Sequence, residues 1–521
     1  MITIRRHASS LLRPAKKLSL KPKKAKSLGI ALDDISSPAR TRFAPSPTGF
    51  LHLGSLRTAL YNYLLAKSTG GQFLLRLEDT DQKRLVQGAE DNIYESLKWC
   101  GLHWDEGPLI GGPYEPYRQS DRHEIYAQYS NTLIDSGNAY RCFCSKERLD
   151  KLRESAQRLQ PPTTVSYDRN CAHISPEESA KRAESGEPYT VRFKSPNTYP
   201  AFEDLLHGKV DLQPQINKDD VRYDDQVLIK SDGLPTYHFA NVIDDHHMKI
   251  THVIRGEEWL PSTPKHIAMY AAFGWTAPKF IHIPLLTSTK DKKLSKRSGD
   301  IDVMNFKKRG ILPEALINFV ALFGWSPRTE KKSEIHVLKE LVELFNTRDL
   351  TRGNAKVDDK KLFFFNKHYL QERINRDDAE ILNQGYEILK ESYPDVTKEQ
   401  STRLIKFVKE HLTNIFEVKN YYYLISDPDL QNEHAQKFIS SVGNNSDAKK
   451  ILSTFSEVGA LEDIDRTTDE LVEAGVQKKV IFQTLRFALS GGIPGLKIPL
   501  LVEFIGVEEA QKRVREAMEK L

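Results

Sequence analysis

The sequence has no apolar run long enough to cross a membrane, and it has very little cysteine. A membrane-spanning helix needs about 18 or more consecutive apolar residues, and no stretch of the chain approaches that length. Four cysteines among 521 residues are too few for a disulfide-stabilised secreted scaffold. These absences predict a soluble globular protein without a membrane partner. Its length predicts several domains.

Acidic residues are absent from the first 32 positions, where Ser and Leu are interspersed among Lys and Arg. The first 40 residues carry ten Lys and Arg against two acids, a net charge of +8, whereas the whole chain is only +5 and the remainder is therefore −3. Residues 1–37 are typical of a mitochondrial transit peptide, which predicts a matrix location. The alternative is a basic tail that binds RNA or directs the chain to the nucleus. Elsewhere, any RNA contact must come from local basic patches.

The segment after the leader has the pattern of a strand, a helix and a second strand. Thr41–Ala44 reads as a strand, and a turn with two prolines follows it. Leucines at 53, 56, 60 and 64 have helical spacing up to Gly70-Gly71, and the alternating segment Gln72–Glu78 reads as the second strand. This unit predicts an α/β fold with a doubly wound parallel sheet of the Rossmann type.

Further along, the composition changes three times. Residues 121–224 interrupt the sheet pattern and read as an α+β insertion, so the sheet domain is predicted to be split between 38–120 and 225–275. A strand-like sequence pattern returns at 226–229 and 250–254. A connecting region of 276–369 precedes residues 370–521, which show almost no strand signal and predict an all-helical region.

Two short motifs point to phosphate chemistry. His52 and Gly54 fall at the start of the first helix, where backbone amides and the helix dipole attract phosphate. Lys293-Leu294-Ser295-Lys296-Arg297 lies in a segment with four cations in six positions, which suits closure over a triphosphate. Alone, the first could be an ordinary capped helix and the second a solvated basic turn. The two motifs stand about 240 residues apart, in this order.

As a pair, the motifs resemble the His-x-Gly-His-like and Lys-Met-Ser-Lys-Ser-like elements of the class I aminoacyl-tRNA synthetases. Ser55, Leu294 and Arg297 depart from that pattern in a way usual for the glutamate branch. Further segments are similar to glutamyl-tRNA synthetases of the bacterial and organellar type: Arg42-Phe-Ala-Pro-Ser-Pro-Thr-Gly49, Leu75-Arg-Leu-Glu-Asp-Thr-Asp81, Trp104-Asp-Glu-Gly-Pro108, Tyr117-Arg-Gln-Ser120, Tyr237-His-Phe-Ala-Asn241, Ile254-Arg-Gly-Glu-Glu-Trp259 and Leu485-Arg-Phe-Ala-Leu-Ser-Gly-Gly492.

The resemblance implies a glutamate–tRNA ligase that uses ATP and Mg²⁺ and charges tRNA-Glu, and it implies a monomer. Its implied catalytic residues are His52, Lys293 and Lys296. The implied glutamate site consists of Arg42, Phe43, Ala44, Glu78, Tyr237, His238, Phe239, Ala240, Asn241 and Arg255. The implied ATP site consists of His52, Gly54, Glu258, Lys293, Leu294, Ser295, Lys296 and Arg297. Alternatively, Arg255 and Glu258 could form a surface ion pair.

The resemblance also assigns roles to the segments. It implies that 121–224 binds the tRNA acceptor end, that 276–369 contacts the stem and that 370–521 binds the anticodon. Within the last segment, Lys478, Lys479, Arg486 and Lys497 are candidate RNA cations. Tyr421, Tyr422 and Tyr423 could stack on bases or pack in a core. The rival functions are a glutamine–tRNA ligase, a catalytically inactive tRNA-binding paralogue and a tRNA-modifying paralogue.

The insertion contains a candidate zinc site. Cys142 and Cys144 are followed, after 26 intervening residues, by Cys171 and His173. Two pairs of thiolate and imidazole ligands at such spacing suit tetrahedral Zn²⁺. The alternative is three reduced cysteines that bind no metal.

Overall fold

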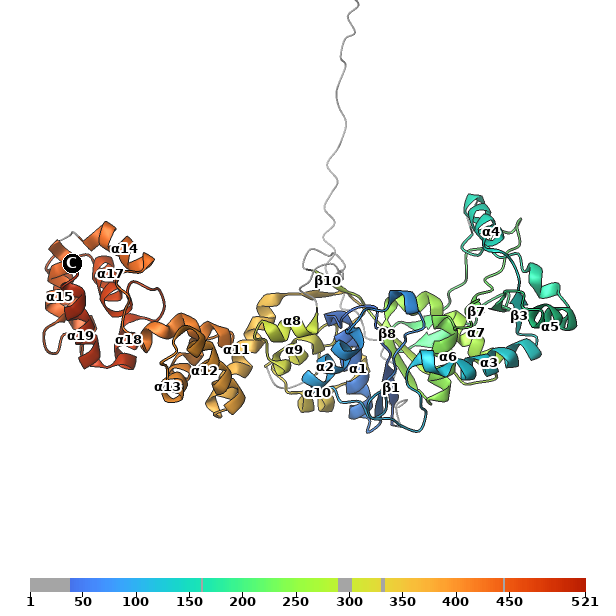
Figure 1. Cartoon of the computed structure of the whole chain (residues 1–521), viewed down its shortest axis with the longest axis horizontal. Coiled ribbons are helices and arrows are strands. Elements are labelled where there is room, and N and C mark those ends of the chain that lie inside the picture. The colour runs from blue at the N-terminus through green and yellow to red at the C-terminus, as the bar shows by residue number, and fades with distance from the viewer. Residues whose placement is uncertain (1–37, 161–162, 289–301, 329–332, 444–445) are drawn as a thin grey trace, which may run out of the picture.

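The computed structural model describes residues 38–160, 163–288, 302–328, 333–443 and 446–521. The described chain is elongated (Figure 1). The parallel strands lie near its middle, β3, α4 and α5 lie at one end, and α14 to α19 lie at the other. The predicted leader 1–37 and the motif at 293–297 fall outside the described residues. No described helix combines the length and apolarity needed to cross a membrane.

Two pairs of parallel strands form the central layer. β1 (Arg40–Phe43) pairs with β2 (Gln72–Leu75), and β8 (His252–Gly256) pairs with β9 (Lys279–Ile283). β1 lies beside β8, where the amide of Thr251 donates to the Arg40 carbonyl at 2.9 Å. These strands are buried along most of their length, as parallel strands covered on both faces must be. The predicted α/β class is confirmed.

The first helix, α1 (Leu53–Ser68), has clear start and stop signals. It begins at His52, whose Nδ1 accepts from the Ser55 amide at 3.2 Å. Its four predicted leucines are all buried. It ends before Gly70, which has a positive φ of 69°. A Cβ on Gly71 would lie 1.9 Å from the Ala39 carbonyl oxygen, so glycine is required for the chain to turn into β2.

The insertion is interleaved with the central layer. Its antiparallel sheet has the order β3-β4-β7, formed by Ala139–Cys142, Thr190–Phe193 and Val227–Ile229. Between β4 and β7 the chain returns as β5 (Phe202–Asp204) and β6 (Gly208–Val210), and β5 pairs with β9. The strand predicted at 226–229 therefore belongs to the insertion, because a short apolar run specifies burial but not a pairing partner.

Helices make up the rest of the described chain. Those of the central part and the insertion are α2 (Ala89–Trp99), α3 (His123–Asp135), α4 (Lys146–Arg158), α5 (Pro176–Glu184), α6 (Tyr237–His247) and α7 (Thr263–Ala272). The connecting region contains α8 (Val303–Lys308), α9 (Pro313–Ala321), α10 (Leu338–Leu344) and a two-stranded ladder of β10 (Leu286–Ser288) and β11 (Ala355–Val357).

The last part of the chain is helical, as predicted. Its helices are α11 (Asp359–Asn375), α12 (Ala379–Ser392), α13 (Lys398–Val408), α14 (Glu433–Phe438), α15 (Ser446–Phe455), α16 (Ile464–Glu473), α17 (Lys478–Ser490), α18 (Ile498–Ile505) and α19 (Val507–Met518). Among the described residues beyond β11, no strand occurs.

The contact at Gly71 generates a stability prediction. Gly71→Ala should lower the stability of the central part by about 1–3 kcal/mol, because the new methyl group overlaps a backbone oxygen. Gly353→Ala is the matched control, since nothing lies within 4 Å of a Cβ at that site. Calorimetry of both variants measures the difference. Equal melting temperatures in the two variants would contradict the close approach.

Candidate active site

A cleft of about 1200 Å³ opens at the carboxyl ends of β1, β2 and β8. Open parallel sheets bind ligands at such an edge. The N-terminal ends of α1 and α6 also border the cleft. The structure brings together most of the predicted site residues that it describes; those lining the cleft are Arg42, Phe43, Ala44, His52, Gly54, Glu78, Tyr237, Asn241, Arg255 and Glu258.

Three predicted glutamate-site residues do not line the cleft. Phe239 and Ala240 are fully buried in an apolar cluster with α3 and α7. His238 is directed to His266, with Nδ1 3.0 Å from its Nε2. The reason is helical geometry: positions 237 and 241 are four residues apart and share one face of α6, so the positions between them face elsewhere.

His52 and Gly54 form the start of α1 at the cleft wall. The Nε2 atom of His52 lies 3.2 Å from the Ser55 hydroxyl, while Nδ1 accepts from the Ser55 amide. A Cβ on Gly54 would lie 3.2 Å from the His52 ring, so any larger residue would crowd the ring. The helix start therefore presents the imidazole and unhindered backbone to a ligand, which is the local geometry of an anion site.

Beneath the cleft, Asp245 is shared by two buried arginines. Its Oδ1 accepts from Arg42 Nε at 3.0 Å and from Arg76 Nη1 at 2.7 Å. Burial raises the pKa of Asp245, but the two cations outweigh that effect and lower it below its usual value. Arg76 also donates to Glu78 at 3.1 Å. The side-chain oxygen of Asn241, oriented to satisfy its hydrogen bonds, accepts from Arg42 and Arg76.

The neighbouring Asp244 makes a second set of buried contacts. It accepts from Arg122 Nε at 2.8 Å and Gln119 Nε2 at 2.8 Å, and both of its oxygens accept from the Tyr126 hydroxyl. Sequence reasoning missed Arg76, Asp244 and Asp245. A signal for this network was present in the sequence: Asp244 and Asp245 are adjacent acids in a mostly apolar helical segment. Acids buried in such a segment require cationic partners.

Arg255 is held in a different way, by neutral acceptors. Its Nε donates to His282 Nε2 at 3.0 Å, its Nη2 donates to Thr263 Oγ1 at 2.8 Å, and its Nη1 lies 3.3 Å from His266 Nδ1. Burial lowers the pKa of Arg255. Arg255 is only 4% exposed and makes no ion pair with Glu258 in the described part of the chain. The alternative of a surface ion pair is therefore wrong.

Tyr237 and Glu258 complete the wall on the α6 side. The Tyr237 ring packs against Trp259 with centroids 4.2 Å apart. Burial raises the pKa of Tyr237 to about 12, so its hydroxyl keeps its proton at neutral pH. Gly256 makes room for Glu258, because a Cβ at 256 would lie 2.0 Å from the Glu258 carboxylate.

In the insertion, three cysteines converge without His173. The Sγ atoms of Cys142, Cys144 and Cys171 lie within 4.8 Å of one another, and His173 is not part of the group. The predicted fourth ligand is thus corrected: His173 ends a short 3₁₀ turn and is exposed. The Tyr167 hydroxyl is nearby instead, 3.3 Å from Cys142 Sγ and 3.6 Å from Cys144 Sγ.

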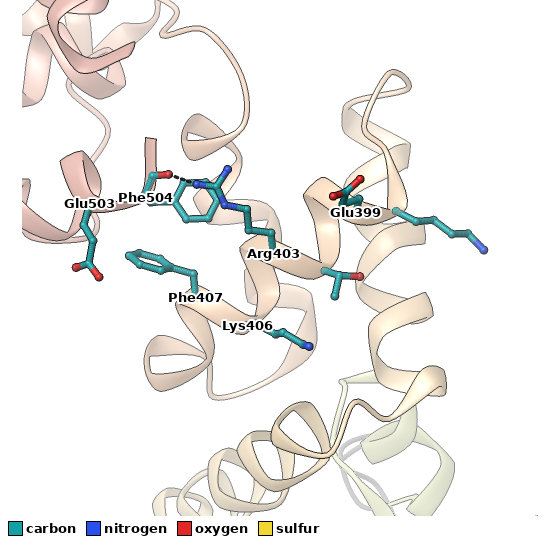
Figure 2. A pocket seen from close by; sticks show the side chains of 8 residues that line it. Glu399, Arg403, Lys406, Phe407, Glu503 and Phe504 are labelled. Atoms are coloured by element: carbon teal, nitrogen blue, oxygen red, sulfur yellow. Dashed lines mark hydrogen bonds between the residues drawn. The ribbon is translucent and has the colours of Figure 1, made fainter. Parts of the chain in front are cut away.

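At the other end of the molecule, a second cavity of about 830 Å³ lies between α13 and α18. In Figure 2, the Arg403 guanidinium donates a hydrogen bond to the Phe504 carbonyl. The central carbon of the same guanidinium lies 4.6 Å from the centroid of the Phe504 ring. Lys398 and Lys406 add positive charge at the rim, and Glu399 and Glu503 add negative charge. The cavity is therefore of mixed charge with an aromatic wall.

Several candidate RNA residues of the helical region have structural contacts. Tyr423 is buried and its hydroxyl accepts from the Leu496 amide at 3.1 Å, so core packing is the correct interpretation for this tyrosine. Arg486 donates to the Leu496 carbonyl at 2.8 Å. The other three cations, Lys478, Lys479 and Lys497, are exposed.

Comparison with known proteins agrees with this geometry. Residues 38–364 match the class I tRNA synthetase catalytic domain for glutamate and glutamine, and residues 382–518 match an anticodon binding domain. The chain belongs to the class I synthetase family specific for these two amino acids.

Its similarity to glutamate enzymes extends over nearly the full length. The chain is 52% identical to the mitochondrial glutamate–tRNA ligase of Saccharomyces cerevisiae, over 98% of this chain and 95% of that protein. It is 40% identical to the glutamate–tRNA ligase of Clostridioides difficile, over 91% of this chain and 98% of that protein. A crystal structure of a glutamate tRNA ligase from Elizabethkingia meningosepticum, in complex with its amino acid, superposes with a TM-score of 0.80 at 37% identity, covering 93% of this chain and 100% of that one.

The shared carboxylate beneath the cleft generates a second stability prediction. Asp245→Asn should cost about 3–5 kcal/mol, because it leaves two buried arginines short of their anionic partner. Glu470→Gln is the control: it removes an exposed ion pair to Arg466 and should change stability by less than about 1 kcal/mol. Urea unfolding monitored by circular dichroism compares the two. A loss for Asp245→Asn as small as the control would show that the buried network is not needed.

Proposed function

We propose that the chain is a glutamate–tRNA ligase, which forms glutamyl-adenylate from L-glutamate and ATP and transfers the glutamyl group to the 3′ end of mitochondrial tRNA-Glu. The observation that carries this proposal is a buried cation at the cleft that has no carboxylate partner in the part of the chain that the structure describes. Arg255 lines the cleft, and among the described residues its hydrogen-bond partners are neutral. A substrate carboxylate supplies the missing charge.

The rest of the cleft fits an amino acid with an acidic side chain. Arg42 is oriented by Asp245 and presents a second guanidinium to the same cleft, and guanidinium groups bind carboxylates through paired hydrogen bonds. Glu78 lies three residues beyond β2, and its carboxylate suits the substrate α-amino group. Tyr237 and Asn241 lie on the adjacent face of α6. Phe43 and Ala44 add backbone and apolar surface beside them.

The reaction needs positioning and charge stabilisation rather than an enzyme nucleophile. The glutamate α-carboxylate attacks the α-phosphate of ATP, which releases diphosphate, and the terminal ribose hydroxyl of tRNA then displaces AMP. His52 and Gly54 at the start of α1 suit the phosphates, and Glu258 suits the rest of the nucleotide. We extend the phosphate role to Lys293, Leu294, Ser295, Lys296 and Arg297, with Mg²⁺ neutralising phosphate charge.

The rival functions are less consistent with the site. A glutamine site has no use for a guanidinium without a counter-charge, because the neutral amide would leave that buried charge unpaired. An inactive paralogue would have no need to keep His52, Gly54, Arg255 and the buried carboxylate network together. A paralogue that only modifies tRNA would lack the helical region, which is present from α11 onward.

The shape of the molecule supports a tRNA partner that spans it. The insertion and the helical region lie at opposite ends of an elongated chain, with the parallel strands that border the cleft between them (Figure 1). We propose that 121–224 receives the acceptor end, that 276–369 contacts the stem, and that α12 to α19 contact the anticodon arm. Exposed Lys478, Lys479 and Lys497 serve the last contact. We further propose that the enzyme acts as a monomer in the mitochondrial matrix, as the basic leader suggests.

A glutamate-dependent diphosphate exchange assay with saturating tRNA tests the function. Wild-type protein should exchange with glutamate and not with glutamine. Arg255→Ala should lose most activity with glutamate but proportionally less of any trace activity with glutamine, because removing the cation costs about 2–5 kcal/mol only for the charged substrate. The measurement is kcat/KM for both amino acids.

Two outcomes would count against these assignments. Exchange with glutamine in place of glutamate would reject the function itself. An unchanged ratio of the two kcat/KM values in Arg255→Ala would show that Arg255 does not bind the substrate side chain. Lys98→Ala is the control for charge removal, because this exposed lysine on α2 does not line the cleft.

We also propose that the insertion binds Zn²⁺ through Cys142, Cys144, Cys171 and Tyr167. Tetrahedral zinc with bonds of about 2.3 Å to sulfur and 2.0 Å to oxygen requires S···S separations of about 3.8 Å and S···O separations of about 3.5 Å. The Cys144–Cys171 separation is 3.5 Å, and the tyrosine oxygen lies at 3.3 and 3.6 Å from two sulfurs.

The zinc proposal predicts one metal ion per chain by elemental analysis of protein purified without chelators. Cys171→Ser should abolish the metal content, whereas His173→Asn should leave it intact because His173 lies outside the group. The apolar cluster around the cysteines is small, so metal loss should also increase proteolysis of the insertion. Zinc-free protein with full resistance to proteolysis would contradict the proposal.

A further inference from the structure

The side chains behind Arg255 form a hydrogen-bonded chain that ends on a buried carboxylate. His282 lies on β9, is fully buried, and receives Arg255 Nε on its Nε2 at 3.0 Å. On its other side, His282 Nδ1 lies 2.7 Å from Asp204 Oδ2. Asp204 ends β5, is also fully buried, and belongs to a different segment of the chain.

The contacts of Asp204 determine which ring nitrogen of His282 carries the proton. Besides His282 Nδ1, its oxygens accept from the backbone amides of Leu206 at 2.9 Å, His207 at 2.8 Å and His282 at 3.1 Å. Three backbone amides donate to this carboxylate, which favours its ionised form. An ionised Asp204 binds a protonated Nδ1, and His282 Nε2 is then left with a lone pair directed at Arg255.

Thr263 completes a neutral acceptor pair with His282. Its Oγ1 accepts from Arg255 Nη2 at 2.8 Å and lies 3.0 Å from His282 Nε2, while its hydroxyl donates to the Trp259 carbonyl at 3.2 Å. The two atoms therefore bind the guanidinium where a carboxylate would otherwise form a bidentate pair. Asp245, by contrast, binds Arg42 directly and neutralises it. At Arg255, the fixed negative charge of Asp204 is separated from the cation by an imidazole ring.

We propose that His282, held in one tautomer by Asp204, is a positioning residue that orients Arg255 toward the substrate side chain without neutralising its charge. This inference rests on the proposed role of Arg255 in glutamate binding, and it identifies the residue that orients Arg255 for that role. A carboxylate in place of His282 would orient the guanidinium equally well but would compete with the substrate for its charge. A residue without an acceptor would leave Arg255 Nε without its partner, and Thr263 and His266 alone would hold the guanidinium less firmly.

The test compares substitutions that differ in one acceptor atom. His282→Asn can still donate to Asp204 but has no atom at the Nε2 position, whereas the longer His282→Gln places an amide oxygen there. In aminoacylation assays, His282→Asn should raise the KM for glutamate about tenfold to hundredfold, as expected for the loss of one hydrogen bond to a charged group. Its kcat and its KM for ATP should change less than about threefold, and its preference for glutamate over glutamine should fall. His282→Gln should recover most of the glutamate KM.

The matched control is His252→Asn. His252 is a buried histidine on β8, three residues before Arg255, and its Nδ1 contacts Thr251 rather than Arg255. This control should lose stability without any selective change in the glutamate KM. His282→Leu, which has a similar volume and no acceptor, replaces His282→Asn if the latter does not fold. A parallel rise in the KM values for glutamate and ATP, or equal values for the Gln and acceptor-free variants, would overturn the proposal.

Arg255→Ala, measured alongside, separates this inference from the proposed function. If that variant loses glutamate preference while His282→Asn and His282→Leu keep it, Arg255 reads the side chain and only the positioning role of His282 is wrong. If Arg255→Ala itself keeps the preference, the assignment of Arg255 fails and the positioning role fails with it.

Discussion

The ion pairs of Asp244 and Asp245 beneath the cleft join segments that are far apart in the sequence. Both acids lie on α6 and are almost inaccessible to solvent, so each must have a cationic partner if it is to remain charged. Arg42 comes from β1, Arg76 follows β2 and Arg122 precedes α3. The requirement for paired charge therefore sets the positions of the strand ends and helices from which the cleft is built.

Two of the arginines that line the cleft, Arg42 and Arg255, show how one residue type serves two purposes. Arg42 is bound to Asp245 and contributes an oriented set of donors with little unbalanced charge. Arg255 is bound to His282 and Thr263 and keeps its charge for a ligand. Desolvation makes the unbalanced cation costly when the cleft is empty, and an anionic substrate relieves that cost. Selectivity for an acid over its amide then follows from the protein partners of a guanidinium.

The sequence predicted those features that depend on neighbours along the chain. His52 and Gly54 share the start of one helix, so their meeting at the cleft followed from helical spacing. The partners of Arg255 were missed because Asp204 and His282 come from strands whose pairing no local pattern specifies. Residues 238–240 were predicted as site residues because they lie between Tyr237 and Asn241 in the sequence. The helix directs their side chains away from the cleft. The prediction that His173 joins the cysteine group was wrong for a similar reason, because spacing in sequence does not give the direction of a side chain.

The path of the chain through the insertion limits how the enzyme can be divided. The segment leaves the central layer for β3 and β4, returns to place β5 and β6 beside β9, and leaves again for β7. A swap of the whole segment for that of a relative would remove an edge of the central sheet together with Asp204. Two shorter grafts, one on either side of β5 and β6, would preserve both. The same restriction applies to insertions and deletions in this chain, because β5 and β6 belong to the central sheet whereas the two excursions lie outside it.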